Sequence, residues 1–199
     1  MKTKKVAAFL PLLAGIGLGI VALAVPFLLA NHYIIVEGAR HPADSYLFFL
    51  WGKYYTVAGA KMIQSQMVLY TLGDFPMYAM IAIIIGILFA VLSMFSGRGI
   101  VLGFKGREFK FKLNTSPIWL QFTSLALLLG AYLYMKEAAR VLVMALMVNN
   151  YVVEYGPAID FLLGSIFAMV LTIVLTLIKL RKESLKVQVP QIQGSVQGS

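Results

Sequence analysis

Four uncharged runs constrain the fold of this chain more than any other feature of its sequence. Residues 6–30, 75–95, 118–135 and 161–178 contain no Asp, Glu, Lys, Arg or His. An α-helix rises about 1.5 Å per residue, so roughly 20 such residues cross a hydrocarbon core about 30 Å thick. We therefore predict an all-α integral membrane protein, a bundle of four membrane-spanning helices at about 6–30, 75–95, 118–135 and 159–178.

The composition supports a single membrane domain. Charged residues make up only 13% of the chain, against about 25% in a typical soluble domain. We assign residues 1–186 to this domain and predict a disordered tail over 187–199, which ends in "VPQIQGSVQGS". The first run also resembles a secretory signal because lysines precede it, but it exceeds the roughly 7–15 apolar residues of a signal. We interpret it as an uncleaved span.

The basic residues indicate the orientation of the spans. With four spans, twelve of the 17 Lys and Arg residues fall on one side of the membrane and five on the other. The five are Arg40, Lys53, Lys61, Lys136 and Arg140. Cytoplasmic loops carry the excess of Lys and Arg, so we place both termini in the cytoplasm of a multi-pass protein of the cell membrane. The net charge of +9 is then a topology signal, and we expect no nucleic-acid partner.

Two segments are predicted to face outward, residues 31–74 and 136–157. The first contains "HYIIVE" and "YLFFLWGKYYTV", which are typical of strands, with a turn at Gly52-Lys53, and "AGAKMIQSQMVLY", which favours a short helix. We predict a small extracytoplasmic cap made of a short β-sheet plus a helix; the alternative is a segment lying among the headgroups, where Tyr and Trp are common. The helical spacing of 136–157 predicts that the third span continues beyond the bilayer.

A cytoplasmic β-hairpin is predicted within residues 97–116, between spans two and three. "GIVLGFKGREFKFKL" alternates apolar with basic or small residues, which is the period of a strand. A two-residue turn at Gly106-Arg107 would pair Lys105 with Glu108. One face would then collect the apolar residues, which we predict to contact the bundle end, the membrane surface or a partner subunit: Ile100, Leu102, Phe104, Phe109, Phe111 and Leu113.

Small residues recur on three of the predicted spans at a spacing of four. Helices in lipid associate through close backbone approach and interhelical hydrogen bonds, so such residues favour helix packing, within the bundle or against another subunit. The predicted packing residues are Gly15, Gly19, Ala82, Gly86, Ala90, Gly164, Ala168 and Thr172.

Catalytic and metal-binding signatures are sparse. Cysteine is absent, which excludes disulfides and thiolate chemistry. No catalytic motif occurs, and no ionisable residue lies in the middle of a span, where proton and ion pathways place them. We assign no catalytic residue and no cofactor. Thioethers suit Cu(I), so a copper site is an alternative; its candidates are Met77, Met80, Met144, Met147, His32 and His41. These residues equally fit apolar packing and solvent exposure.

In its layout the chain resembles claudin-type tetraspan proteins: cytoplasmic termini, a long first outer loop, a short second one and a basic tail. The claudin loop signature requires a Trp followed by Gly-Leu-Trp and two cysteines, whereas here Trp51-Gly52 stands alone. The resemblance is one of topology, and no residue role is carried over from it.

These observations predict a non-catalytic protein, a structural or accessory subunit of a larger membrane protein complex. Its expected partners are other membrane subunits and lipid, and a homo-oligomer is compatible with the packing stripes. The alternative class is a small transporter or channel, for instance one that handles Cu(I). A membrane enzyme acting on a quinone or lipid would require reactive groups from partner chains.

Overall fold

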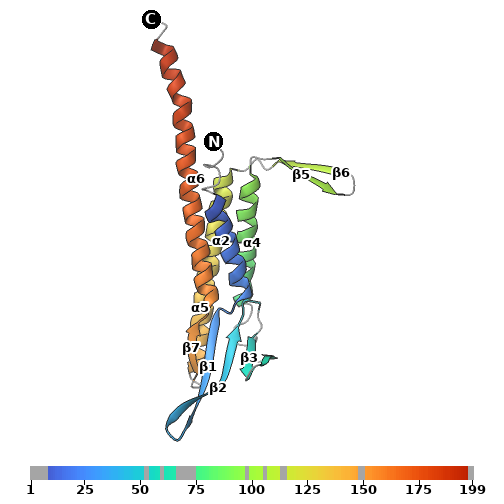
Figure 1. Ribbon diagram of the computed structural model, residues 1–199, viewed down its shortest axis with the longest axis vertical. Coiled ribbons are helices and arrows are strands. Elements are labelled where there is room, and N and C mark those ends of the chain that lie inside the picture. Colours follow the sequence, from blue (N-terminus) through green and yellow to red (C-terminus); the bar gives the residue numbers. More distant parts are fainter. Residues whose placement is uncertain are drawn as a thin grey trace.

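The computed structural model describes residues 9–51, 54–58, 61–65, 75–96, 99–104, 107–112, 116–147 and 151–196. Within these residues the chain is mostly helical, with four helices side by side, a sheet at one end of them and a separate hairpin at the other (Figure 1). The helices are α2 (Phe9–Ala24), α4 (Phe75–Phe95), α5 (Pro117–Met147) and α6 (Pro157–Val196). The strands are β1 (Leu28–Val36), β2 (Ala39–Phe48), β3 (Tyr54–Ala58), β4 (Lys61–Ser65), β5 (Gly99–Phe104), β6 (Arg107–Lys112) and β7 (Tyr151–Tyr155).

Three of the described helices contain a segment long and apolar enough to cross a membrane. These segments are Met77–Phe95, Pro117–Met144 and Pro157–Arg181, whereas α2 is a shorter apolar helix. The first span was predicted to run to residue 30, and this prediction is wrong at its end, because α2 stops at Ala24 and β1 begins at Leu28. Pro26 lacks the backbone N–H that a continuing helix requires and disfavours helical dihedrals in the residue before it.

The larger sheet has five antiparallel strands in the order β4-β3-β2-β1-β7. It is more extensive than the predicted cap, and the all-α class is too narrow for this chain. The helix predicted over "AGAKMIQSQMVLY" is wrong at Lys61–Ser65, which pairs with β3, Thr56 opposite Ile63. Pairing with a neighbouring strand outweighs local propensity there. The turn predicted at Gly52-Lys53 lies outside the described residues.

The segment between α5 and α6 supplies the fifth strand. α5 continues to Met147, past the predicted end of the span at residue 135, so the helical extension is confirmed as far as Met147. Residues 151–155 were also predicted to be helical, and there the prediction is wrong: they form β7, which pairs with β1, Ala30 opposite Val153. Buried residues of α5, among them Ala138, Ala139 and Leu142, join those of β1 and β2 in the same apolar core as the bundle.

At the junction of bundle and sheet, two helix-to-strand connections lie side by side. Phe27 donates a backbone hydrogen bond to the carbonyl of Phe48 (2.8 Å), and Gly156 donates one to the carbonyl of Phe27 (2.8 Å). Ala158, in the first turn of α6, donates one to the carbonyl of Pro26 (3.1 Å). The last of these bonds occupies an N–H in the first turn of α6 that has no partner within that helix.

The last helix is longer than expected. α6 runs to Val196, so the disordered tail predicted over 187–199 is wrong for residues 187–196. Leu185, Lys186, Gln188 and the other Gln residues of this segment are acceptable helix formers, and the prediction from its composition did not take this into account. In Figure 1 this part of α6 extends well past the ends of the other three helices.

The predicted hairpin is present, but its register differs by two residues from the expected one. Phe104 pairs with Arg107 and Leu102 with Phe109, so the connection is 105–106, not the predicted turn at Gly106-Arg107. A shift of two keeps every position on the same face of the ribbon. The apolar alternation therefore fits both registers equally well and does not distinguish them.

The junction leaves no room for a side chain at Gly156. A Cβ atom built there would lie 2.3 Å from the carbonyl oxygen of Pro26. We expect Gly156→Ala to force the two backbones apart and to lower the free energy of unfolding by about 1–3 kcal/mol. Thermal unfolding of the purified protein in detergent would measure this. Gly130→Ala is the matched control, because a Cβ atom there meets nothing within 4 Å; an equal loss in both variants would contradict the prediction.

Candidate functional site

The four helices pack along seams with alternating spacings of three and four residues. On α4 the buried positions are Ala79, Ile83, Gly86, Ala90 and Ser93. On α5 they include Gln121, Ser124, Leu128, Ala131, Met135, Ala138 and Leu142. α2 buries Leu12, Gly15, Gly19 and Ala22 with the same spacing. This is the heptad pattern of left-handed helix packing, common in soluble coiled coils and membrane bundles alike.

Two buried serines hold the helices together in antiparallel pairs. Ser124 Oγ on α5 donates to the carbonyl oxygen of Gly86 on α4 (2.7 Å). Ser165 Oγ on α6 donates to the carbonyl oxygen of Gly15 on α2 (2.6 Å). In each pair the acceptor is a glycine, whose missing side chain lets the serine reach the backbone. The bundle is therefore two pairs, α4 with α5 and α2 with α6, each joined by a hydroxyl-to-carbonyl hydrogen bond.

The residues predicted to pack helices lie in or beside these seams. Gly15 lies against Ala168, Gly19 against Ile87, Gly86 against Leu128, and Gly164 against Leu18. Ala90 and Thr172 are buried, and Ala82 packs against the core. Ser165 makes the shorter of the two interhelical hydrogen bonds, but it was not among the predicted packing residues. Its signal was the alternating spacing of small and hydroxyl residues, which a search at a spacing of four alone does not reveal.

Within the described part of the bundle, one buried side-chain polar atom has no hydrogen-bond partner. Gln121 on α5 is buried, and its Oε1 has no hydrogen-bond partner in the described part of the chain. Three further hydroxyls each donate to a backbone carbonyl of their own helix: Ser93 to that of Ala90, Thr172 to that of Ala168, and Thr176 to that of Thr172. These three hydroxyls and those of Ser124 and Ser165 are therefore all bonded to backbone carbonyls, and the bonds of Ser124 and Ser165 join neighbouring helices.

Aromatic residues mark both ends of the apolar bundle. At the hairpin end Trp119 is 68% exposed. Phe122, three residues further along α5, and Phe95, the last residue of α4, are exposed as well. At the sheet end Tyr78 on α4 and Tyr134 on α5 are exposed, as is Tyr155 at the end of β7. Trp and Tyr are enriched at the two membrane–water interfaces, so these residues delimit a layer that fits a bilayer.

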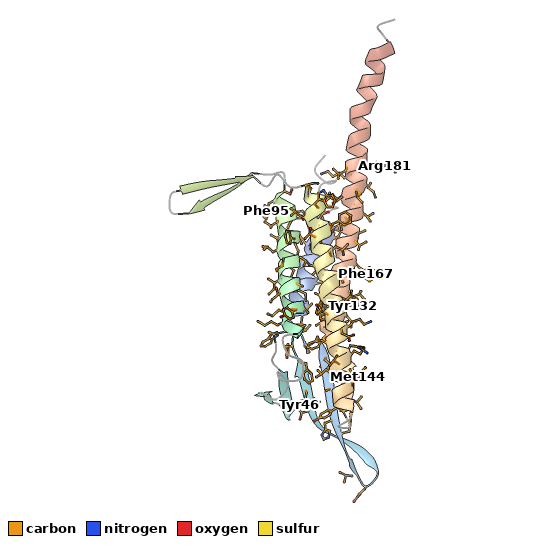
Figure 2. All side chains as sticks on the ribbon, turned by 180° about the vertical axis from the view of Figure 1, so that it is seen from behind. Tyr46, Phe95, Tyr132, Met144, Phe167 and Arg181 are labelled. Carbon is orange, nitrogen blue, oxygen red and sulfur yellow. The ribbon has the colours of Figure 1, made fainter. Side chains whose placement is uncertain are left out.

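Charges on α6 delimit the same layer. Asp160 and Lys179 are the first and the next charged residues of this helix. They are 19 positions apart, which corresponds to about 28 Å along a helix, close to the roughly 30 Å of a hydrocarbon core. Between them the helix exposes large apolar side chains, including Phe167 at 67% and Leu171 at 50%, and Figure 2 shows Phe167 between Tyr132 and Arg181 along the bundle.

The candidate copper ligands are not brought together in the described residues. Met77 and Met144 are exposed, while Met80 packs against the core. α4 and α5 are antiparallel, and the contact of Gly86 with Ser124 and Leu128 sets Met144 roughly 10–16 Å beyond Met77 along the bundle. Figure 2 shows Met144 beside the sheet. The side chains of Met147 and His41 lie outside the described part.

His32 sits in an aromatic cluster on the sheet. Its ring lies 4.8 Å from that of Tyr151, which in turn makes an edge contact with Tyr46 at 5.5 Å. Tyr46 is paired with the small residue Ala30 on β1, which leaves space above the sheet for the two tyrosines. Among the described residues, no group of three His, Asp or Glu side chains is placed to hold a metal ion.

No protein-family model and no curated protein matches this chain. Its function therefore has to be inferred from its own residues and contacts.

The serine bonds give a testable contribution to stability. We expect Ser165→Ala to lower the free energy of unfolding by about 0.6 kcal/mol and by no more than about 1.7, the range for interhelical hydrogen bonds in membranes. Thr123→Ala is the control, because the Thr123 hydroxyl bonds within its own helix, to the carbonyl of Trp119, and is exposed. Unfolding in mixed micelles would compare the two; a larger loss for Thr123→Ala would contradict the proposed role of Ser165.

Proposed function

We propose that this chain is a four-span membrane protein that acts as a non-catalytic structural or accessory subunit of a larger membrane protein complex. Both termini and the β5–β6 hairpin lie in the cytoplasm in this proposal, and the five-stranded sheet caps the outer end of the bundle. In the proposed topology the first span consists of α2 and the apolar residues 6–8 before it. The observation that carries the proposal is that the buried hydroxyls of Ser124 and Ser165 bond to carbonyls of neighbouring helices, while the four uncharged runs contain no Asp, Glu, Lys, Arg or His.

A transport pathway through one copy would require polar or charged groups facing a common path. Between Asp160 and Lys179 the last span has none that are ionisable, and the hydroxyl groups of Ser124 and Ser165 are bonded to backbone carbonyls. Intramembrane charges are costly and persist mainly where function uses them. Their absence from these spans favours a role performed through surfaces over one performed through an interior site.

The charge distribution supports the orientation. The sheet side carries five Lys and Arg residues and the hairpin side twelve. The only ion pair within the described residues on the sheet side joins Arg140 to Glu137, bidentate and exposed, with Arg140 Nε 2.9 Å from a carboxylate oxygen.

The orientation can be tested with single cysteines, because the natural chain has none. Val36→Cys places a thiol at the exposed end of β1, and Ser199→Cys places one at the end of the chain. In intact cells we expect a membrane-impermeant maleimide to label Val36→Cys and to label Ser199→Cys only after permeabilisation. Labelling in the reverse order, or of both variants in intact cells, would contradict the orientation.

The role as a subunit predicts association in the membrane. After gentle solubilisation with a mild detergent, we expect the protein to migrate in native electrophoresis as part of an assembly well above its 21.9 kDa. Mass spectrometry of the excised band would separate a homo-oligomer from a complex with other chains. The same sample in a denaturing detergent provides the marker for the protomer; migration of the native sample with that marker would overturn the proposal.

A further inference from the structure

The β5–β6 hairpin stands apart from the rest of the protein. It leaves the bundle where α4 ends at Phe95 and returns where α5 begins at Pro117. In Figures 1 and 2 it projects sideways, across the axis of the bundle, and lies beside none of the described helices along its length. Its six-residue strands give it a length of roughly 20 Å.

The register sorts its positions into two rows. Ile100 pairs with Phe111 and Leu102 with Phe109, while Val101 pairs with Lys110 and Gly99 with Lys112. Directly opposed residues share a face and neighbours along a strand alternate. One row of positions is therefore apolar up to Phe104 opposite Arg107 at the tip, and the other contains the lysines. Leu113, predicted to extend the apolar row, lies outside the described residues.

A two-stranded hairpin with an apolar face is marginally stable alone in water. The apolar row thus needs a cover, and the described bundle does not supply it. The root of the hairpin lies at the aromatic boundary of the apolar layer, between exposed Phe95 and the 68% exposed Trp119. A ribbon that leaves this boundary sideways, across the axis of the helices, runs along the membrane surface in the proposed placement.

We propose that the β5–β6 hairpin lies flat on the cytoplasmic leaflet, with the row Ile100, Leu102, Phe109 and Phe111 in the lipid interface and its basic residues held by anionic headgroups. The inference rests on the proposed placement of the bundle in a bilayer. The segment 98–112 carries five basic residues and one acidic residue, which complements the negative potential of this leaflet. Lipid is also continuous with the surface of the spans from which the hairpin emerges.

The charge contribution has an expected size. A lysine near an anionic membrane surface contributes about 1 kcal/mol, which corresponds to about a fivefold change in the ratio of docked to free hairpin. Residues on the far side of so thin a ribbon remain within about a Debye length, 8–10 Å, of the headgroups. Removing Lys110 and Lys112 together should then lower that ratio about 25-fold on anionic vesicles and leave it nearly unchanged on zwitterionic ones.

Single cysteines again provide the test. Phe109→Cys and Lys110→Cys, each in the full chain reconstituted in phosphatidylglycerol-containing vesicles, would carry a spin label whose accessibility to oxygen and to a water-soluble nickel complex is measured. We expect accessibility to the nickel complex to be lower at 109 than at 110 by about fivefold, with the reverse trend for oxygen. Phe111 and Lys112 should repeat this alternation.

A third label separates failure of this inference from failure of the bundle placement. Phe167→Cys lies on the exposed face of α6 midway along the bundle and should be accessible to oxygen but not to the nickel complex. If 167 behaves so while 109 and 110 are equally open to the nickel complex, the hairpin is free in water and the inference is wrong. If the label at position 167 is itself accessible to the nickel complex, the proposed placement of the bundle in a bilayer is wrong.

The remaining outcomes identify the cover. Protection of 109 that persists in phosphatidylcholine vesicles and with Lys110→Gln and Lys112→Gln combined would show that headgroup charge is not involved, which overturns that half of the inference. Protection of 109 that appears only in native membranes, and not in pure lipid vesicles, would assign the apolar row to a partner subunit and overturn the lipid contact. Free inorganic phosphate, added as a competitor, should not release a hairpin held by a membrane surface.

Discussion

Backbone hydrogen bonds join the end of α2 to the start of α6, and the remaining architecture follows from this contact. α2 ends shortly before Pro26 and α6 begins at Pro157, so both connections between a helix and a strand lie at the same level. Gly156 can donate to the carbonyl of Phe27 because its own side chain is absent. The contact sets α2 beside α6 above the junction and β1 beside β7 below it, in one antiparallel pairing that begins in the helix bundle and ends in the sheet.

The second helix pair depends on the same principle of close backbone approach. Gly86 admits Ser124, and Gly15 admits Ser165, so each pair contains a serine bonded to a glycine carbonyl. Lipid provides no hydrophobic drive between helices, and short packing distances with interhelical hydrogen bonds replace it. The part of α5 that follows residue 135 then covers the sheet, since Ala138, Ala139 and Leu142 share a core with Leu28 and Phe48. Bundle and sheet are therefore one body.

The sequence predicts the features that depend on local chemistry. Uncharged runs locate α4, α5 and α6, and the two-residue alternation of 99–112 locates the hairpin. Features that depend on distant partners are less accessible. Val153 lies in a strand because it pairs with Ala30 on β1, and Lys61–Ser65 forms a strand because it pairs with β3. Four of the five residues of β7 are β-branched or aromatic and favour a strand, but the prediction followed the helical spacing of the longer segment; Lys61–Ser65 carries little signal of its own. The packing residues lie between these two cases. Glycines spaced four apart can be recognised in the sequence, but Ser165 belongs to a seam whose spacing alternates between three and four, which follows from helix supercoiling.

The two ends of the molecule differ in what fixes them. At the sheet end, backbone hydrogen bonds from β1 to both β2 and β7 tie the strands to α2 and α6, so their position is determined within the chain. At the other end the β5–β6 ribbon has only its own register and its two connections to α4 and α5. A ribbon of six-residue strands with an apolar row cannot be stable on those terms in water. What holds it in place must therefore come from outside the described bundle and sheet, and in the proposed placement the nearest apolar medium at the level of Trp119 is the bilayer.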